Sequence, residues 1–194
     1  MARTQAADYG ERREAMLDQA AALFARAGFQ GASMTDLAAA CKVSKSLLYH
    51  YFPSKEDVLF EVMSSHLEQL VDDVNEAIER GQGDSDKVNA LIHAFMRHYA
   101  GAADRHKVLL NELGNLPEDR RGVIVGKQRS IIDAVQLLLA KLPGSPKDAP
   151  RLRAFTMLLF GMINWTHTWF DPAGPVSPDE LADMVSGLIL PSAR

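Results

Sequence analysis

Apolar residues recur at steps of three and four along almost the whole chain, a period that places them on one face of an α-helix. Between Glu11 and Arg26 this set comprises Ala15, Met16, Ala20, Leu23 and Phe24, and Gly28 follows as a stop signal. The alternation that is typical of strands is nearly absent. The sequence therefore predicts an all-α fold of about nine helices.

Capping residues and helix breakers divide this pattern into individual helices. Ser33 with Asp36 predicts a capping box, Ser44 predicts a second N-cap, and Pro53 ends the short helix that follows. A long helix then runs from Lys55 to about Arg80. Further helical stretches carry apolar faces over residues 88–99, 108–113, 124–139, 151–170 and 177–190.

The glycine- and serine-containing segment 81–85 is the first clear linker, and the charge of the chain changes along its length. Residues 1–55 contain seven Lys and Arg against five Asp and Glu, whereas the rest contains fourteen against twenty. We divide the chain into an N-terminal domain over 10–70 and a C-terminal domain over 71–194. A basic first part on an acidic body suits a chain that offers one end to a polyanion.

Composition excludes several classes of protein. A chain of 194 residues with 47% hydrophobic residues and a single cysteine is an ordinary globular protein that needs no disulfide, metal or cofactor to form a core. No apolar leader is present near residue 1, so we expect a cytoplasmic protein, associated with the nucleoid if it binds DNA. The uncharged stretch 154–170 contains polar Thr, Asn and His residues, which favours a buried or interface helix over a membrane span.

Residues 33–52 form a helix, a tight turn and a second helix, which is the pattern of a helix-turn-helix. The outer face of the second helix carries Lys45, Ser46, Tyr49 and His50, with Tyr51 at its flank, and no acidic residue. Donors and aromatic rings without a carboxylate suit the phosphates and base edges of duplex DNA. The motif therefore predicts DNA binding.

Residues 11–60 resemble the N-terminal domain of the TetR family of transcriptional regulators. The resemblance rests on the amphipathic first helix, Gly28-Phe29, the capped second helix, Val43-Ser44 and the run LYHYF. It implies a dimeric repressor whose C-terminal domain binds a small inducer. The positions that match DNA contacts of the family are Ser33, Thr35, Lys45, Ser46, Tyr49, Tyr51 and Lys55, to which we add His50 from the outer face. Lys42 stands where the family often has glycine.

The resemblance also implies a homodimer that pairs its last two helices and binds a palindromic operator in double-stranded DNA. The expected interface residues are Phe160, Gly161, Asn164, Trp165, Thr168, Leu181, Met184, Val185 and Leu188. The expected inducer pocket is lined by Phe60, Met63, Leu67, Phe95, Met96, Tyr99, Asn111 and Met157, which at helical spacing also suit a plain core. A looser similarity of the C-terminal part to regulators of fatty-acid and acyl-CoA metabolism suggests an acyl-CoA or another apolar acid.

Two other functions compete with this hypothesis. An all-helical enzyme would need a reactive polar cluster, and the sequence contains neither a G-x-S-x-G nucleophile motif nor a glycine-rich phosphate loop. His93 and His98 are five residues apart and do not share a helical face, so we expect no metal site, and Cys41 faces inward as a small packing residue. A helical ligand-binding or protein-interaction module without specific DNA binding is the remaining alternative.

Overall fold

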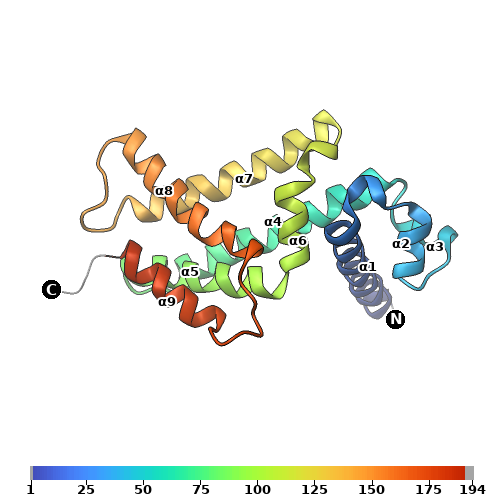
Figure 1. Cartoon of the computed structure of the whole chain (residues 1–194), viewed down its shortest axis with the longest axis horizontal. Coiled ribbons are helices and arrows are strands. Elements are labelled where there is room, and N and C mark those ends of the chain that lie inside the picture. The colour runs from blue at the N-terminus through green and yellow to red at the C-terminus, as the bar shows by residue number, and fades with distance from the viewer. Residues whose placement is uncertain (1, 191–194) are drawn as a thin grey trace. The chain divides into compact units, whose positions relative to one another are not determined.

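The structure of the chain is a computed structural model that describes residues 2–190, with side chains from Tyr9 onward. This part contains nine α-helices, two short 3-10 helices and no strand, which confirms the predicted all-α fold. The elements are α1 (Ala2–Gly31), α2 (Met34–Ala40), α3 (Lys45–Tyr51), α4 (Lys55–Arg80), α5 (Asp84–Gly101), α6 (Ala103–Asn111), η1 (Leu113–Asn115), α7 (Glu118–Leu139), α8 (Ala149–Asn164), η2 (Trp165–Thr168) and α9 (Pro178–Ile189) (Figure 1).

The chain folds into two compact units that interleave along the sequence. The first unit contains the residues up to His66 together with 104–125, and the second contains 67–103 and the residues from Gly126 onward. Helices α4 and α7 therefore each contribute to both units. The predicted domain boundary after residue 70 stays a prediction.

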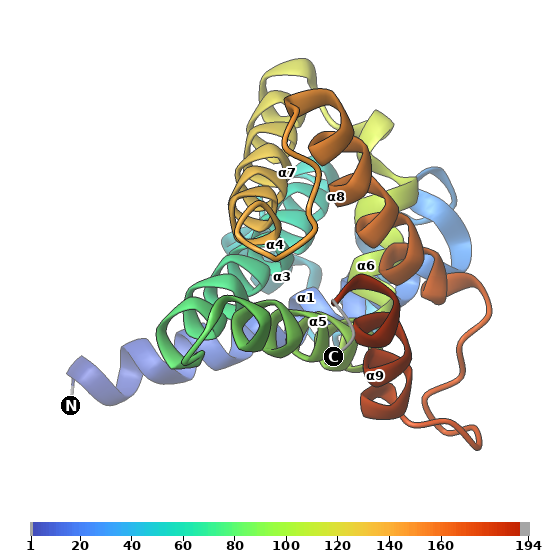
Figure 2. The same ribbon diagram turned by 90° about the vertical axis from the view of Figure 1, so that its left-hand side faces the viewer.

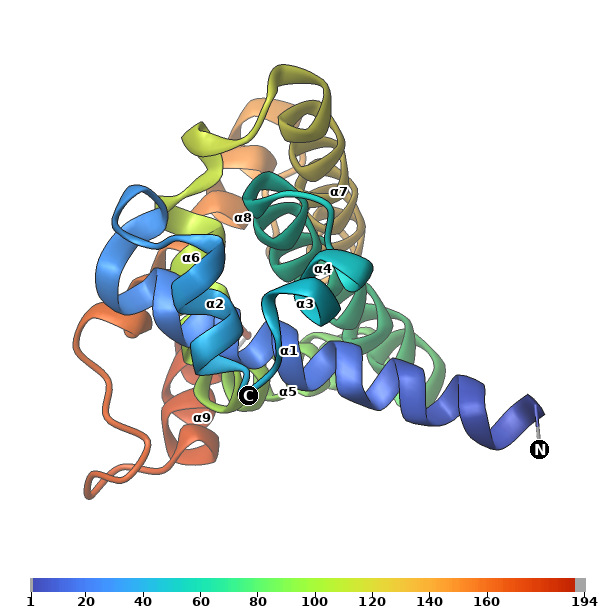
Figure 3. The same cartoon turned by 90° about the vertical axis from the view of Figure 1, so that its right-hand side faces the viewer.

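The core of the first unit forms where α1, α2 and α3 pack together (Figure 3). Its largest fully buried side chains include Leu17, Phe24, Leu37, Leu48 and Phe52. Burying such a side chain stabilises the fold by about 1.5–3 kcal/mol. Burial of the inward residues of α3 therefore fixes the orientation of the helix, and with it the direction in which its outward residues point.

The predicted caps of this unit are present. Ser33 and Asp36 form a reciprocal capping box, in which the Asp36 amide donates to Ser33 Oγ and the Ser33 amide donates to Asp36 Oδ2. Ser44 Oγ accepts from the Leu47 amide at the start of α3. Each cap satisfies amides that the first helical turn leaves without an intrahelical partner.

Two predicted helix boundaries were wrong. Helix α1 begins at Ala2 rather than near Glu11, because its first turns lack the apolar face on which the prediction relied. Gly28 does break it, at φ 73° and ψ 161°. Helix α8 ends at Asn164, and the chain continues as η2, whereas one continuous helix was predicted to Phe170.

A polar cluster around the buried Arg105 lies between α1, α4 and α6 in the first unit. The side chain of Arg105 is only 5% exposed and donates to Asp18 Oδ1 at 2.8 Å, to Ser65 Oγ at 2.8 Å and to Glu14 Oε2 at 3.0 Å. A guanidinium with several fixed donors can be buried at tolerable cost only when such acceptors surround it. Arg105 therefore fixes α6 against α1 and α4.

Helices α5 and α9 lie side by side in the second unit (Figure 2). The apolar face predicted for α5 is buried over its whole length, and Phe95 stacks against Tyr99 and contacts Phe160 of α8. At the rim, His93 contacts Asp179 at 3.2 Å and Asp183 at 3.0 Å, one carboxylate on each ring nitrogen. Apolar packing and an ionic rim together dock α9 on α5.

Candidate nucleic-acid interface

The helix-turn-helix is built from α2, the turn of residues 41–44, and α3 (Figure 3). Within the turn, Lys42 has φ 55°, a left-handed conformation that residues with a Cβ rarely adopt. Among the described residues it is the one non-glycine residue with positive φ. The strained turn sets the angle between α2 and α3, so α3 can present its outer face while Leu48 enters the core.

The outer face of α3 has the properties that the sequence predicted. Lys45, Ser46, Tyr49 and His50 are all exposed, and Tyr49 keeps 43% of its surface accessible. The Lys45 ammonium lies 5.9 Å from the centre of the Tyr49 ring, within cation–π range. No acidic residue occurs between Asp36 and Glu56. The face therefore combines a cation, hydroxyl groups and an accessible aromatic ring without a nearby carboxylate.

Tyr51 is half-buried and lies at the edge of this face. Its ring stacks on Tyr9 of α1, with the ring centres 4.5 Å apart and the planes at 16°. The sequence prediction missed Tyr9, because it began the first helix at Glu11, two residues after this tyrosine. Only a first helix extended toward the N-terminus would have brought Tyr9 near α3 in the prediction.

The remaining predicted DNA contacts differ in how free their side chains are. Thr35 is exposed at the first turn of α2. Ser33 is exposed too, but its hydroxyl donates to Asp36 Oδ2 at 2.6 Å, and this bond with the Ser33 amide bond lowers the pKa of Asp36. Lys55 donates to the carbonyls of Phe29 and Ala32, each at 2.8 Å, and lies 4.1 Å from the Phe29 ring centre. In this structure Lys55 therefore closes the end of α1.

Cys41 at the end of α2 is only partly exposed, and its Sγ lies 3.7 Å from the Met16 carbonyl. Burial raises the pKa of the Cys41 thiol, so the neutral form is favoured. A neutral thiol is a poor nucleophile. This environment agrees with the packing role expected from the sequence.

The predicted inducer-pocket residues are divided between the two units, and the pocket stays a prediction. Phe60, Met63 and Asn111 belong to the first unit and the other five to the second, and both Asn111 and Met157 are exposed. Met96 and Tyr99 do line a cavity of about 40 Å³ with Thr166 and His167. Burial raises the pKa of the Tyr99 hydroxyl, with the charge of Asp73 as a second cause.

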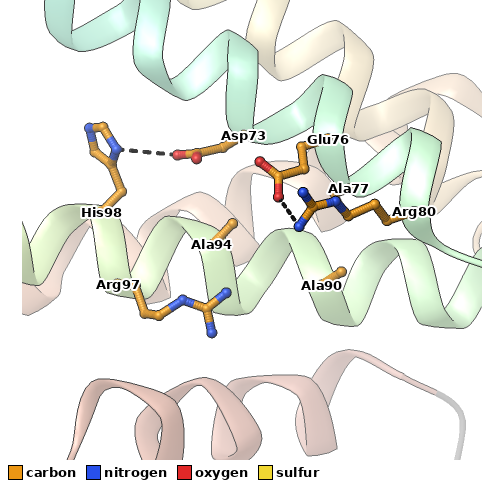
Figure 4. A pocket seen from close by; sticks show the side chains of 8 residues that line it. All are labelled: Asp73, Glu76, Ala77, Arg80, Ala90, Ala94, Arg97 and His98. Carbon is orange, nitrogen blue, oxygen red and sulfur yellow. Dashed lines mark ion pairs between the residues drawn. The ribbon is translucent and has the colours of Figure 1, made fainter.

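A larger groove of about 510 Å³ lies between α4 and α5 in the second unit (Figure 4). Small alanines at its floor leave the space, and charged side chains form its walls. Asp73 pairs with His98 at 3.3 Å, and Glu76 pairs with Arg80. The sequence prediction missed this groove. Alanines in a sequence do not indicate a cavity, because the groove forms only where the alanines of two helices face each other.

The predicted interface residues of α8 and α9 fall into two groups. Phe160 and Val185 are buried in the second unit. Gly161, Trp165, Thr168, Met184 and Leu188 are exposed, and Trp165 and Leu188 keep 65% and 74% of their surface accessible. Asn164 and Leu181 are intermediate. An apolar face thus remains uncovered on both helices.

The described residues contain neither a candidate metal centre nor a membrane-spanning helix. No group of three or more His, Cys, Asp or Glu side chains is arranged to hold a metal ion. None of the helices has the length and apolar character needed to cross a bilayer.

Comparison with known families covers both parts of the chain. Residues 16–62 match the family model for bacterial regulatory proteins of the tetR family, and residues 81–192 match that for the tetracyclin repressor-like C-terminal domain. The chain belongs to the TetR family. Members of this family are transcriptional regulators rather than enzymes. The protein is therefore a DNA-binding regulator.

Individual TetR proteins agree with this assignment. A TetR-family regulator from Bordetella parapertussis 12822 is 40% identical, with a TM-score of 0.86 over 92% of this chain and 93% of that one. The repressor KstR2 of Rhodococcus jostii is 24% identical, covering 92% of this chain and 89% of its own. AibR, solved with isovaleryl coenzyme A and operator DNA, shares the fold at a TM-score of 0.80 and 24% identity, over 93% of this chain and 98% of its own.

Proposed function

We propose that this TetR regulator is a repressor that binds a palindromic operator as a homodimer and is released by a small apolar inducer of the acyl-CoA type. The observation that carries the DNA-binding part is the acid-free outer face of α3. Its exposed cation and aromatic ring are fixed by the buried side of the same helix. The DNA contacts are Ser33, Thr35, Lys45, Ser46, Tyr49, His50, Tyr51 and Lys55.

The dimer part rests on the uncovered apolar face of α8 and α9. The exposed Met157 and Gly161 of α8 and Trp165 at the start of η2 follow each other at four-residue spacing, and on α9 Met184 and Leu188 do the same. Residues at this spacing form one stripe along a helix. A self-complementary stripe on two helices suits an isologous dimer, whose two recognition helices would read half-sites about 34–36 Å apart. Met157 then belongs to this interface rather than to the pocket.

Support for the inducer class comes from two sources. The sequence of the C-terminal part resembles regulators of acyl-CoA metabolism, and AibR, which has the same fold, binds isovaleryl coenzyme A. Apolar residues such as Phe95 and Met96 would accept an acyl chain once the helices around them separate. The inducer releases the DNA only if it binds two conformations of the dimer with different affinity, and if these conformations differ in the spacing of the recognition helices.

Selection of bound duplexes from a random DNA pool tests the DNA-binding part. We expect one palindrome to be enriched by the wild type at near-physiological salt. Lys45→Ala should weaken binding and reduce its salt dependence, because it removes a phosphate-neutralising charge. Lys141→Ala, which removes an exposed lysine from the second unit, is the matched control and should leave binding unchanged. Enrichment of no sequence by a folded protein would favour the interaction module instead.

Titration of the operator complex with acyl-CoAs of increasing chain length tests the inducer part. We expect release of the duplex at micromolar concentrations of the matching chain length, with free coenzyme A as the control. A complex that survives every acyl-CoA would overturn this inducer class and leave the DNA-binding proposal intact.

A further inference from the structure

Helix α1 extends well beyond the part of the chain that the helix-turn-helix requires. It begins at Ala2, whereas the match to the tetR-family model begins at residue 16. Tyr9 therefore lies seven positions before the matched segment, and 44% of its surface is exposed. An exposed tyrosine on a polar stretch of helix is not needed for the core, so its contact with α3 calls for another explanation.

That contact is a parallel stack of Tyr9 on Tyr51, the half-buried tyrosine at the end of the recognition helix. The ring centres are 4.5 Å apart with an angle of 16°, closer than the contacts of Tyr51 with His50 at 5.9 Å and with Phe52 at 6.2 Å. The two latter residues are chain neighbours of Tyr51, and their rings lie at 87° and 36° to its plane rather than parallel to it. Tyr9 is therefore the group that covers a face of the Tyr51 ring.

The stack on Tyr9 restricts the rotamers of the Tyr51 side chain already in the protein without DNA. A flexible aromatic side chain that is immobilised on binding reduces affinity, and fixing it beforehand avoids this loss. Tyr51 lies at the border of the exposed α3 face, where side chains of a helix in the major groove reach the sugar-phosphate backbone. The stack thus fixes the Tyr51 ring at the border of the face that, in the proposed function, meets the duplex.

We propose that Tyr9 is a positioning residue of the DNA interface, which holds Tyr51 against the duplex backbone. The inference rests on the proposed function, because it presumes that α3 binds a duplex. It adds a residue of α1 to the helix-turn-helix, and the partner of the Tyr51 side chain is the phosphate backbone of double-stranded DNA.

Variants at residue 9 test the role of the ring separately from that of the hydroxyl. Tyr9→Ala removes the stack, and alanine is the best helix former, so circular dichroism and thermal unfolding should show an intact fold. We expect its dissociation constant for the selected operator to rise about two- to tenfold, which is what loss of an aromatic pair corresponds to. Tyr9→Phe keeps the ring and should bind as the wild type does, and so should Gln19→Ala, an exposed change elsewhere on α1.

A double-mutant cycle with Tyr51→Ala supplies the readout that a merely structural role would not change. If Tyr9 acts through Tyr51, Tyr9→Ala costs no further affinity in the Tyr51→Ala protein. Additive losses, unchanged binding of Tyr9→Ala, or an equal loss in Tyr9→Phe would each overturn the proposal while wild-type binding stands. Failure of the wild type to select any duplex would overturn it together with the proposed function.

Discussion

At the scale of single residues, Lys42 carries the clearest local strain. Its left-handed backbone at φ 55° costs a residue with a Cβ about 1–2 kcal/mol, which glycine does not lose. The turn keeps this conformation because two hydrogen bonds tie it to the end of α2: the Lys42 amide donates to the Ala39 carbonyl at 3.1 Å and the Val43 amide to the Ala38 carbonyl at 3.0 Å.

Lys42→Gly should therefore stabilise the protein. Relief of strain exceeds the entropy that glycine adds to the unfolded chain, which leaves a gain of about 0.5–1 kcal/mol. Urea unfolding measures this gain as a higher midpoint at unchanged slope. Lys42→Ala keeps the strain and should be nearly neutral. Ala39→Gly, at an exposed position inside α2, should lose about 1 kcal/mol. A Lys42→Gly midpoint at or below the wild-type value would contradict the strain.

Local rules of this kind explain why many residues could be predicted from the sequence. Ser33 with Asp36 and Ser177 with Glu180 form capping boxes because the required groups are three residues apart in the chain itself. The exposure of Lys45 and Tyr49 follows from the helical period once Leu48 is assigned to the core. Tyr9 could not be found in this way, because its partner is 42 positions further along the chain.

At the scale of elements, the docking of α9 on α5 depends on ionised groups at its rim. Hydrogen bonding from the His93 ring is the main cause that lowers the pKa of Asp179; slight burial opposes the shift, and Arg97 at 2.9 Å adds to it. The pKa in the folded protein thus lies below the ordinary value of 3.8. Asp179 consequently stabilises the fold fully above about pH 4, and this contribution is lost as the pH falls through the lowered pKa.

Asp179→Asn should accordingly destabilise the protein wherever the wild-type carboxylate is ionised, that is, above about pH 4. We expect a lower midpoint of thermal unfolding than the wild type at pH 7, and a difference that closes as the pH falls below about 4, where the wild-type carboxylate also becomes neutral. Scanning calorimetry at several pH values measures both. Glu79→Gln changes an exposed acid on α4 and is the control, with no pH-dependent difference. A gap between Asp179→Asn and wild type that persists at pH 3 would refute the ionic explanation.

Element boundaries also mark where sequence reasoning stopped. The helix predicted over 177–190 is confirmed as α9, which begins at Pro178 after its N-cap Ser177. The end of α8 at Asn164 carries no glycine or proline, so the sequence pattern continued a helix that the chain does not form. Burial of most apolar faces was predictable, but the groove between α4 and α5 depends on which faces meet, and that is a property of the packed helices alone.

At the scale of the whole molecule, Leu188 tests whether the uncovered α8 and α9 face joins two copies. Leu188→Glu places a charge on a side chain that is 74% exposed in the single chain. A residue central to an interface contributes roughly 2 kcal/mol, and an isologous interface contains it twice, so the dimer dissociation constant should rise roughly a thousandfold. Analytical ultracentrifugation over a concentration series measures this change.

The matched control is Leu137→Glu, since Leu137 is an equally apolar side chain on α7, 67% exposed and outside the α8 and α9 face. It should leave the protein dimeric. Loss of the dimer should also weaken binding to the palindrome far more than binding to a half-site, because only a dimer engages both half-sites at once. A Leu188→Glu protein that stays dimeric, or a Leu137→Glu protein that dissociates, would move the interface to another face of the chain.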